Sequence, residues 1–179
     1  MKRIVLLYFF FIFLVPQILF ADTQVYFSPN GGCQEAVITE ISHAQKSIDI
    51  AMYSFTSREI AQALIEARGR NVKIRVVLDK AQRKERYSKS RYLISKGIDA
   101  KYHIASGLMH NKFAVIDGKE LLTGSFNWTA SANKKNEENL LIMTNQDVIQ
   151  KYEDRFEYLW NGSSDADAGD EQYNKMDKE

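Results

Sequence analysis

Cysteine is almost absent from this sequence: Cys33 is the only one among 179 residues. A single thiol excludes an internal disulfide bond, so the fold has to rest on its hydrophobic core even in an oxidising compartment. A large net charge is absent as well, because 24 Lys and Arg residues face 23 Asp and Glu residues. No internal repeat is visible. With 45% hydrophobic and 26% charged residues, the composition is globular, and the length predicts one domain.

The N-terminus lacks acidic residues and carries an apolar run. Two basic residues precede twelve apolar ones at 4–15, and Pro16 interrupts the run before Ala21. This order is typical of a secretory signal peptide that is cut after a small residue. We therefore expect residues 1–21 to be a signal peptide and the protein to be exported, either to the periplasm or envelope or into the medium. The alternative is an uncleaved anchor that associates with the membrane, because a span needs about 20 mostly apolar residues.

Acidic residues gather at the C-terminus. Residues 163–179 hold six acidic residues, two lysines and few apolar side chains. A segment of this composition cannot bury enough apolar surface to fold, so we expect an acidic disordered tail. The folded domain is then expected to span residues 22–162, with a mildly cationic body.

Strand-like and helix-like runs alternate along the domain. Alternating or continuous apolar residues predict strands, and apolar residues three or four apart predict helices. In chain order, the first expected elements are a strand at 23–28, a helix at 33–47, a strand at 48–55, a helix at 57–70 and a strand at 72–79. Further strands are expected at 112–116, 120–125 and 139–144, before an amphipathic helix at 146–161. This β-α-β-α-β order predicts an α/β sheet with helices packed on its faces.

Asp117 and Gly118 stand between the apolar runs 112–116 and 120–125. Asp-Gly between two such runs is a strong signal for a β-hairpin. Successive strand side chains point to opposite faces, so Asp117 falls on the face opposite to His110. We therefore interpret Asp117 as a turn residue and not as a carboxylate that orients His110.

Four polar side chains flank this hairpin. His110 and Lys112 are two residues apart and would point to one side, and so would Ser125 and Asn127, with Gly124 leaving room for close backbone approach. Cations and hydrogen-bond donors stabilise phosphate oxygens, and an imidazole can attack or protonate a phosphate. The residues alone leave two hypotheses open: a phosphate site, or a half-exposed hairpin whose polar residues face outward.

The spacing of these residues resembles the HKD signature of the phospholipase D superfamily. The matching positions are His110, Lys112, Asp117, Gly124, Ser125 and Asn127. The chain is most similar to the small bacterial endonucleases of the Nuc type, which carry one motif. The stretches IDIAMYSFTS and NEENLLI also resemble that family, so the similarity covers about residues 22–161. It implies a single-domain, mixed β-sheet flanked by helices on both faces.

The resemblance also implies roles. His110 would be the nucleophile and form a phosphohistidine that water then hydrolyses. Lys112, Ser125 and Asn127 would bind the phosphoryl oxygens, and Glu138 would orient the imidazole. Asp117 completes the catalytic motif and is structural in the family, in agreement with its interpretation as a turn residue.

The departing oxygen needs a positioned acid to protonate it, and a single motif does not provide one. The family supplies this acid from a second motif. Neither His43 nor His103 fills this role, because His43 lies in an amphipathic helix and His103 has no lysine two residues later. The resemblance therefore implies a two-fold homodimer, in which His110 of one chain attacks and His110 of the other protonates.

No metal and no cofactor are expected, because the two Lys112 ammonium groups would offset the charge that Mg²⁺ offsets elsewhere. The competing hypothesis is a carboxylate metal site built from Asp49, Asp79 or Glu138. Asp49 and Asp79 are more simply interpreted as an outward-facing residue and a strand-end residue.

The densest basic segment follows residue 79. It contains Lys80, Arg83, Lys84, Arg86, Lys89 and Arg91, with Tyr87 and Tyr92 between them. Lys and Arg can follow a nucleic-acid backbone while tyrosines stack on bases, so we predict that Lys80, Arg83, Lys84 and Arg86 bind substrate. The alternative is a solvated helix face. Phe126 and Trp128 are expected to pack in the core, with a rim that contacts bases or lipid as the alternative.

These observations give three hypotheses. The first is an exported, metal-independent endonuclease that cleaves DNA, including single strands, and RNA. The second keeps the chemistry and changes the substrate: a phospholipase D that hydrolyses membrane phospholipids. The third is a non-catalytic nucleic-acid-binding module that retains the fold.

Overall fold

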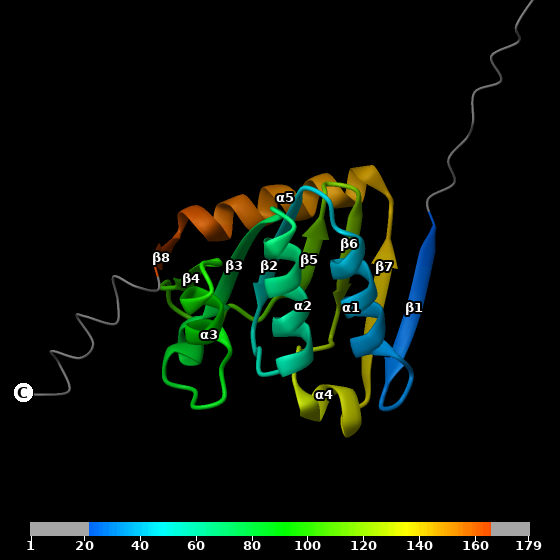
Figure 1. Ribbon diagram of the computed structural model, residues 1–179, viewed down its shortest axis with the longest axis horizontal. Coiled ribbons are helices and arrows are strands. Elements are labelled where there is room, and N and C mark those ends of the chain that lie inside the picture. The colour runs from blue at the N-terminus through cyan, green and yellow to red at the C-terminus, as the bar shows by residue number, and fades with distance from the viewer. Residues whose placement is uncertain (1–21, 166–179) are drawn as a thin grey trace, which may run out of the picture.

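The fold is an eight-stranded mixed β-sheet with helices on both faces, seen in a computed structural model that describes residues 22–165. The strand order across the sheet is β1-β7-β6-β5-β2-β3-β4-β8 (Figure 1). In chain order the elements are β1 (Thr23–Ser28), α1 (Cys33–His43), β2 (Ser47–Met52), α2 (Arg58–Gly69), β3 (Lys73–Asp79), the 3-10 helix η1 (Lys80–Arg83), α3 (Ser90–Ser95), β4 (Asp99–His103), β5 (Lys112–Ile116), β6 (Glu120–Gly124), α4 (Ala130–Lys134), β7 (Glu138–Met143), α5 (Gln146–Asn161) and β8 (Ser163–Asp165).

The first part of the chain follows the predicted β-α-β-α-β order, and β2, β3 and β4 pair in parallel. On its other side β2 pairs with β5 in the antiparallel direction, and Met52 at the end of β2 lies opposite Lys112 at the start of β5. One edge of the sheet, the lower edge in Figure 1, therefore contains the ends of four strands and the starts of two. The ends belong to β2, β3, β4 and β6, and the starts to β5 and β7. Open sheets that contain parallel strands often bind ligands beyond such carboxyl ends.

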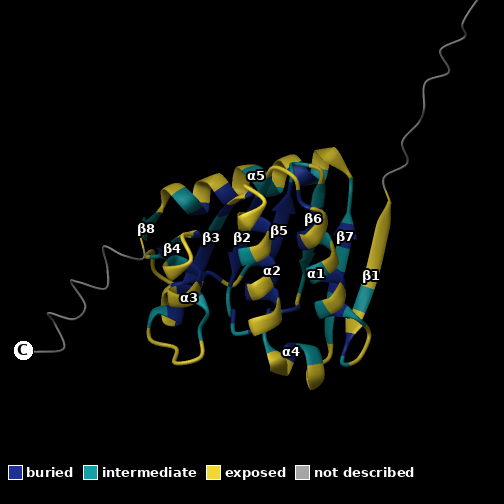
Figure 2. Cartoon of the chain, in the orientation of Figure 1, coloured by how far each residue is buried: buried dark blue, intermediate teal, exposed yellow. Residues whose placement is uncertain are grey.

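The central strands are buried on both faces. Ile48 and Ile50 of β2 pack in one cluster with α1 and α2, which lie side by side in front of the strands (Figure 1). Ala51 packs in a second cluster with α5. Buried residues accordingly fill the middle strands, and exposed residues cover the outer helix faces (Figure 2). Complete burial of one Ile or Leu side chain stabilises the fold by roughly 1.5–3 kcal/mol, so the helices are held to the sheet by these faces.

The helix patterns are confirmed in α1 and largely in α5. Val37 and Ile41 are completely buried, and so is Cys33, the packed thiol at the start of α1. In α5, Phe156 and Leu159 are buried, and the sheet-facing stripe also includes Ile149. None of the helices within residues 22–165 combines the length and the apolar character needed to cross a membrane.

The start of the acidic tail was predicted wrongly. Ser163–Asp165 forms β8, which pairs antiparallel with β4 and places Ser163 opposite His103. This segment has no apolar pattern, and its place in the sheet comes from backbone pairing with an otherwise open edge. The rest of the predicted tail, residues 166–179, and the predicted signal peptide or anchor, residues 1–21, lie outside the described residues.

Candidate active site

The predicted site residues lie at the shared edge of the sheet. His110 comes just before β5, and Lys112 is its first residue. Ser125 follows the last residue of β6, and Glu138 is the first residue of β7. Because β5, β6 and β7 are consecutive neighbours in the sheet, the three segments meet at the edge beside α4.

Asp117 lies at the opposite end of β5 and does not join this group. Its φ of 55° and the φ of 65° at Gly118 form the predicted tight turn. Its carboxylate accepts hydrogen bonds from three backbone amides, those of Gln45, Lys46 and Ser47. Burial acts to raise the pKa of Asp117, but the three donors together hold that pKa below its ordinary value. Asp117 therefore anchors the hairpin to the start of β2.

His110 and Lys112 converge as their spacing predicts. The Lys112 Nζ atom lies 3.3 Å from His110 Nδ1 and donates to the His110 carbonyl oxygen at 2.9 Å. His110 is exposed and Lys112 is half-buried. Burial lowers the pKa of Lys112 below its ordinary value, and the nearby Glu138 carboxylate opposes this shift. A half-desolvated ammonium beside an exposed imidazole is well placed to bind a phosphate that the imidazole attacks.

Tyr53 is a site residue that the periodicity did not identify. Its ring lies 4.5 Å from the His110 ring, centroid to centroid, at 60°. The Lys112 Nζ atom lies 5.1 Å from the Tyr53 centroid. The Tyr53 backbone N–H donates to the Asn111 carbonyl oxygen at 2.9 Å. The aromatic ring therefore restricts the side chains of both His110 and Lys112. The only signal in the sequence was the position of Tyr53 within IDIAMYSFTS.

Ser125 and Asn127 are fixed through their acceptor atoms. The Ser125 hydroxyl accepts from the Asn139 amide at 3.0 Å, while the Ser125 amide donates to Asn139 Oδ1 at 2.7 Å. Asn127 Oδ1 accepts from the Ser54 amide at 3.2 Å. These bonds leave the Ser125 O–H and the Asn127 NH₂ group available as donors. Donors held in this way suit an anion with several oxygens, as was predicted for a phosphate.

Gly124 permits the close approach of β6 to β7. Its φ is 153°, and a Cβ atom at this position would collide with the Asn139 carbonyl oxygen. The same carbonyl oxygen accepts from the amides of Ser125 and Phe126. Any side chain at position 124 would therefore displace the segment that carries Ser125. Phe126 and Trp128, expected in the core, are each only 2% exposed and pack there.

Glu138 does not make the predicted orienting bond to His110. Its Oε1 atom accepts from Asn136 Nδ2 at 3.0 Å. The His110 Nδ1 atom faces Lys112, so the imidazole nitrogen that a carboxylate would hold is already in contact with an ammonium. The Glu138 carboxylate acts on the pair through Lys112, whose pKa it raises against the effect of burial.

Asp79 and Asp49 have structural partners. Asp79 is completely buried, and its carboxylate accepts from the amides of Ala81 and Met109 at 2.9 and 2.8 Å. The bond to Met109 fixes the residue before His110, so Asp79 helps to position His110. Asp49 pairs with Arg75 at 2.7 Å. Within residues 22–165, no group of three or more His, Cys, Asp or Glu side chains lies close enough to hold a metal ion.

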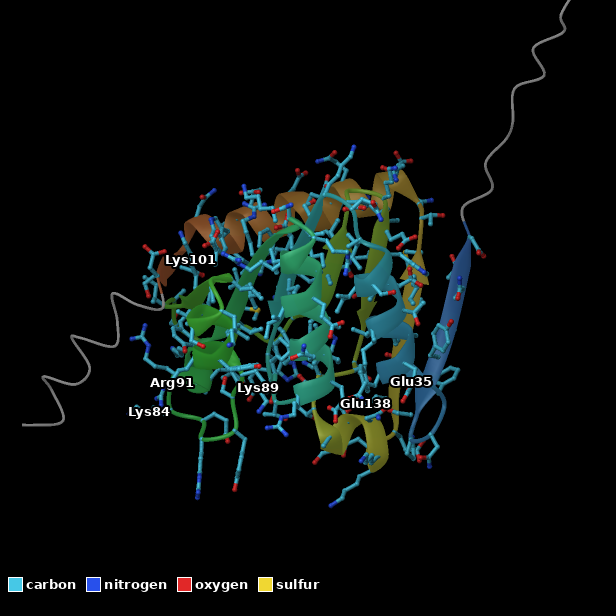
Figure 3. All side chains as sticks on the ribbon, in the orientation of Figure 1. Glu35, Lys84, Lys89, Arg91, Lys101 and Glu138 are labelled. Carbon is cyan, nitrogen blue, oxygen red and sulfur yellow. The ribbon has the colours of Figure 1, made fainter. Side chains whose placement is uncertain are left out.

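The basic segment is not one continuous helix. It forms η1, a loop at 84–89, and the short helix α3. Figure 3 shows Lys84, Lys89 and Arg91 around α3, while Glu138 lies by α4 on the other side of the lower edge. Lys80 Nζ donates to the Ala105 carbonyl oxygen at 3.0 Å. Lys80 thereby ties the basic segment to the loop at 104–109 that leads into His110. Two apolar side chains of that loop, Ile104 and Leu108, are 61% and 63% exposed, a feature that the sequence patterns did not indicate.

Comparison with known proteins agrees with this geometry. Residues 37–160 match the family model described as "Cardiolipin synthase, PLD-like domain". A phospholipase D of Rickettsia conorii is 38% identical over 126 residues, which cover 70% of this chain and 63% of the relative. A mitochondrial cardiolipin hydrolase of Xenopus laevis is 36% identical over 69% of this chain and 59% of the relative. The chain thus spans less than two thirds of these two curated relatives.

A solved structure is similar over nearly its whole length. The phospholipase D family member Nuc of Salmonella typhimurium superimposes with a TM-score of 0.77 and 30% sequence identity. The alignment covers 81% of this chain and 97% of Nuc. The similarity to Nuc that the sequence motif indicated is confirmed, and so is the predicted mixed sheet with helices on both faces.

Proposed function

This chain belongs to the phospholipase D-like family, and from that premise we propose that it is an endonuclease that cleaves phosphodiester bonds of DNA, including single strands, and of RNA. The observation that carries the phosphodiester chemistry is the contact of His110 with Lys112, 3.3 Å from Nδ1 to Nζ, at the exposed edge of the sheet. The similarity to Nuc and the basic segment support nucleic acid as the substrate.

The proposed reaction has two steps. His110 attacks phosphorus through Nε2, a P–N bond forms, and the bond between phosphorus and the leaving oxygen breaks as that oxygen takes a proton. Water then attacks the phosphohistidine, gives up a proton, and displaces His110 to leave a phosphomonoester. Lys112, Ser125 and Asn127 hold the phosphoryl oxygens, so their donors stabilise the charge that develops on them. Because an ammonium supplies this charge, the reaction is proposed to need no metal ion.

Binding of phosphate also reorganises the imidazole in this scheme. A phosphate that takes the Lys112 ammonium releases His110 Nδ1 from its contact with Nζ. The imidazole then exchanges its proton with solvent and takes the tautomer with the hydrogen on Nδ1, which donates to Glu138 and leaves the Nε2 lone pair free to attack. The Glu138 charge stabilises the positive charge that develops on the ring. Glu138 is therefore proposed to orient His110 in the loaded site.

A two-fold homodimer completes the site in this proposal. The chain contributes one HKD motif, and the leaving oxygen needs a positioned acid. His110 of the partner subunit supplies that proton in the first step and accepts the proton of water in the second. The exposure of His110 at the sheet edge leaves it accessible to a second copy. An isologous contact brings each residue near its own copy at the axis.

The test is a substrate panel in EDTA with His110→Ala as the control. Single-stranded DNA, duplex DNA, RNA and phospholipid vesicles are incubated with each protein, and products are separated by size. Cleavage of oligonucleotides by the native protein and not by His110→Ala supports the proposal. Loss of activity in EDTA that Mg²⁺ restores would contradict the metal-free mechanism. Oligonucleotide binding without any turnover would instead favour a non-catalytic binding module.

A phospholipase D is the second candidate function. The exposed Ile104 and Leu108 side chains favour it, because they form an apolar rim on the loop that enters the site. The Rickettsia relative is named a phospholipase D and the Xenopus relative a cardiolipin hydrolase, which agrees with a lipid substrate for those proteins. Release of phosphatidic acid from vesicles, without oligonucleotide cleavage in the same panel, would replace the first proposal with this one.

Export is proposed on residues 1–21 alone. Sequencing the N-terminus of protein from fractionated cells tests it. A start at Asp22 in the periplasmic fraction supports a cleaved signal peptide. A start at Met1 in the membrane fraction supports the anchor, and a cytoplasmic location of the full chain contradicts both.

A further inference from the structure

A cavity of about 300 Å³ lies beside the basic segment, and none of its lining residues belongs to the His110 group. Its walls are Lys80, Arg83, Lys84, Tyr102 and Ile104. Three of these five side chains are cationic, and none is acidic. A concave site with convergent cations is the environment in which proteins bind phosphate groups.

Arg83 is the central side chain of this cavity. Its guanidinium stacks on the Tyr102 ring, 4.7 Å from Cζ to the ring centroid. The Arg83 carbonyl oxygen accepts from Arg91 Nη2 at 2.9 Å, which fixes the backbone at this point. Its Nε and Nη2 atoms are buried, and within residues 22–165 they have no hydrogen-bond partner. Unpaired N–H groups on a buried charge are costly, so a ligand that accepts from them would be favoured.

Two cations of this cavity, Lys80 and Arg83, have no carboxylate partner in the described part of the chain. The Lys80 ammonium binds a carbonyl oxygen instead of a carboxylate. Glu85, the one acid in the segment, accepts from the Tyr87 amide within its own loop. The cavity therefore presents a positive potential that an anion would balance.

We propose that this cavity is a second phosphate subsite, which binds a non-scissile phosphodiester of a polynucleotide whose scissile phosphate lies at His110. The inference rests on the proposed nuclease function. The fork of Arg83 and the ammonium of Lys80 would hold two oxygens of the phosphate. Because protein atoms cover Nε and Nη2, the Arg83 side chain changes rotamer to present them when the phosphate enters.

Two observations favour a polynucleotide over a lipid in this subsite. Lys80 is bonded to the loop at 104–109 that carries His110 at its far end, so both phosphate sites flank one loop. A polynucleotide has a phosphate at each nucleotide and can occupy both sites, whereas a lipid with one phosphodiester can occupy only one. Tyr87 and Tyr92 of the same segment are 64% and 40% exposed and are available to stack on bases.

The test compares Arg83→Gln with Arg155→Gln as a matched control. Arg155 is exposed on α5 and also stacks on a tyrosine, Tyr158, at 5.0 Å, so both variants lose one charge and one stacked guanidinium. Kinetics are measured on a single-stranded oligonucleotide and on bis(4-nitrophenyl) phosphate, a small diester whose single phosphate must occupy the His110 site to be cleaved.

Arg83→Gln is expected to raise KM for the oligonucleotide about tenfold, as loss of a charge-assisted hydrogen bond does. The slope of log KM against log salt should fall by about 0.7. Turnover of the small diester should match that of Arg155→Gln, and the thermal midpoint should not be lower, because Arg83→Gln removes buried N–H groups that have no partner within residues 22–165. Equal oligonucleotide KM values in the two variants, or a parallel loss on the small diester, would overturn the subsite.

A direct measurement covers the case in which Arg83→Gln does not fold. In the His110→Ala protein, which binds without cleaving, the ¹⁵N resonance of Arg83 Nε should shift on addition of oligonucleotide. No shift at saturating oligonucleotide overturns the proposal. If Arg83→Lys raises KM relative to the native protein for cardiolipin vesicles but not for the oligonucleotide, the second phosphate belongs to a lipid and the polynucleotide subsite is overturned. Failure of the nuclease proposal looks different, because the native protein itself would then cleave no oligonucleotide.

Discussion

Lys112 is the residue on which the candidate site depends most, because its ammonium contacts both His110 and Tyr53. Its Nζ atom lies against His110 Nδ1 and over the Tyr53 ring, and its pKa responds to Glu138. Burial lowers that pKa, so the ammonium is partly desolvated and binds an anion more strongly than a surface lysine would. The same desolvation means that the positive charge does not stabilise the fold.

Lys112→Gln should therefore separate activity from stability. We expect kcat/KM on the cleaved substrate to fall by about 10²–10³-fold, the usual effect of removing one preorganised donor to a developing oxyanion. The thermal midpoint should stay the same or rise, because a neutral side chain avoids the desolvation cost. Initial rates and a melting curve on the same preparation check both statements. A matching loss of stability would show that Lys112 is structural.

Asp117 should show the opposite behaviour. Its carboxylate holds three backbone amides at the far end of β5, away from His110. Asp117→Ala is expected to lower the free energy of unfolding by about 1–3 kcal/mol, the usual cost of leaving such donors unsatisfied. The kcat of the folded fraction should not change. Urea titration and active-site-normalised rates measure the two effects, and a large loss of kcat at native stability would return Asp117 to the catalytic group.

The pH dependence of the stabilisation by Asp117 follows from the direction in which its pKa is shifted. The pKa of Asp117 lies below its ordinary value in the folded protein. The group therefore stabilises the fold above its unfolded pKa, and this stabilisation is lost as the pH falls through the folded pKa. The stability difference between the native protein and Asp117→Ala should accordingly shrink in acid.

Among the elements, α1 and β6 each carry one carboxylate of a pair that repels: Glu40 in α1 and Glu120 in β6. Burial, a hydrogen bond with Glu40 and repulsion from Glu40 raise the pKa of Glu120 to about 7, while His43 opposes the shift. Asp117 at the neighbouring turn adds a smaller repulsion. The pair therefore shares a proton in the folded state at mildly acidic pH.

Glu120→Gln should remove a pH-dependent loss of stability. The pKa of about 7 in the folded state lies above the ordinary value of 4.5, so folded Glu120 holds the extra proton between these values. Stability contributed by this group is complete below the unfolded pKa and is lost as the pH rises through 7. We expect the variant to melt higher than the native protein at pH 8 and at the same temperature at pH 4. Parallel melting curves across this range would contradict the assignment.

The sequence predicts a helix or strand well where its side chains repeat with a regular spacing. The hairpin follows from Asp117-Gly118, and the approach of His110 to Lys112 follows from the two-residue repeat of a strand. β8 escaped prediction because Ser163–Asp165 joins the sheet by backbone pairing with β4 alone. The contact between Tyr53 and His110 also escaped it, because Tyr53 follows β2 and His110 precedes β5, two strands that only the sheet order makes neighbours. Local patterns contain no information about such lateral contacts.

At the scale of the whole molecule, the exposed sheet edge and the single motif leave the proposed site half complete in one chain. Mixing native chains with His110→Ala chains tests whether a second copy completes it. If the active unit is a dimer that needs both imidazoles, mixed dimers are inactive. With equal amounts and full subunit exchange, about half of the native chains fall into mixed dimers, so activity should drop to about half.

The control for this mixing experiment is an inert protein at the same concentration, or His110→Ala chains added without time for exchange. Neither should lower the activity of the native chains. A monomeric enzyme predicts no loss at any mixing ratio, because each native chain would work alone. Dilution provides a second measurement: specific activity should fall below the dimer dissociation constant, and the thermal midpoint should fall with it. Specific activity that is constant over the full dilution range would restrict the catalytic acid to groups of the same chain as the nucleophile.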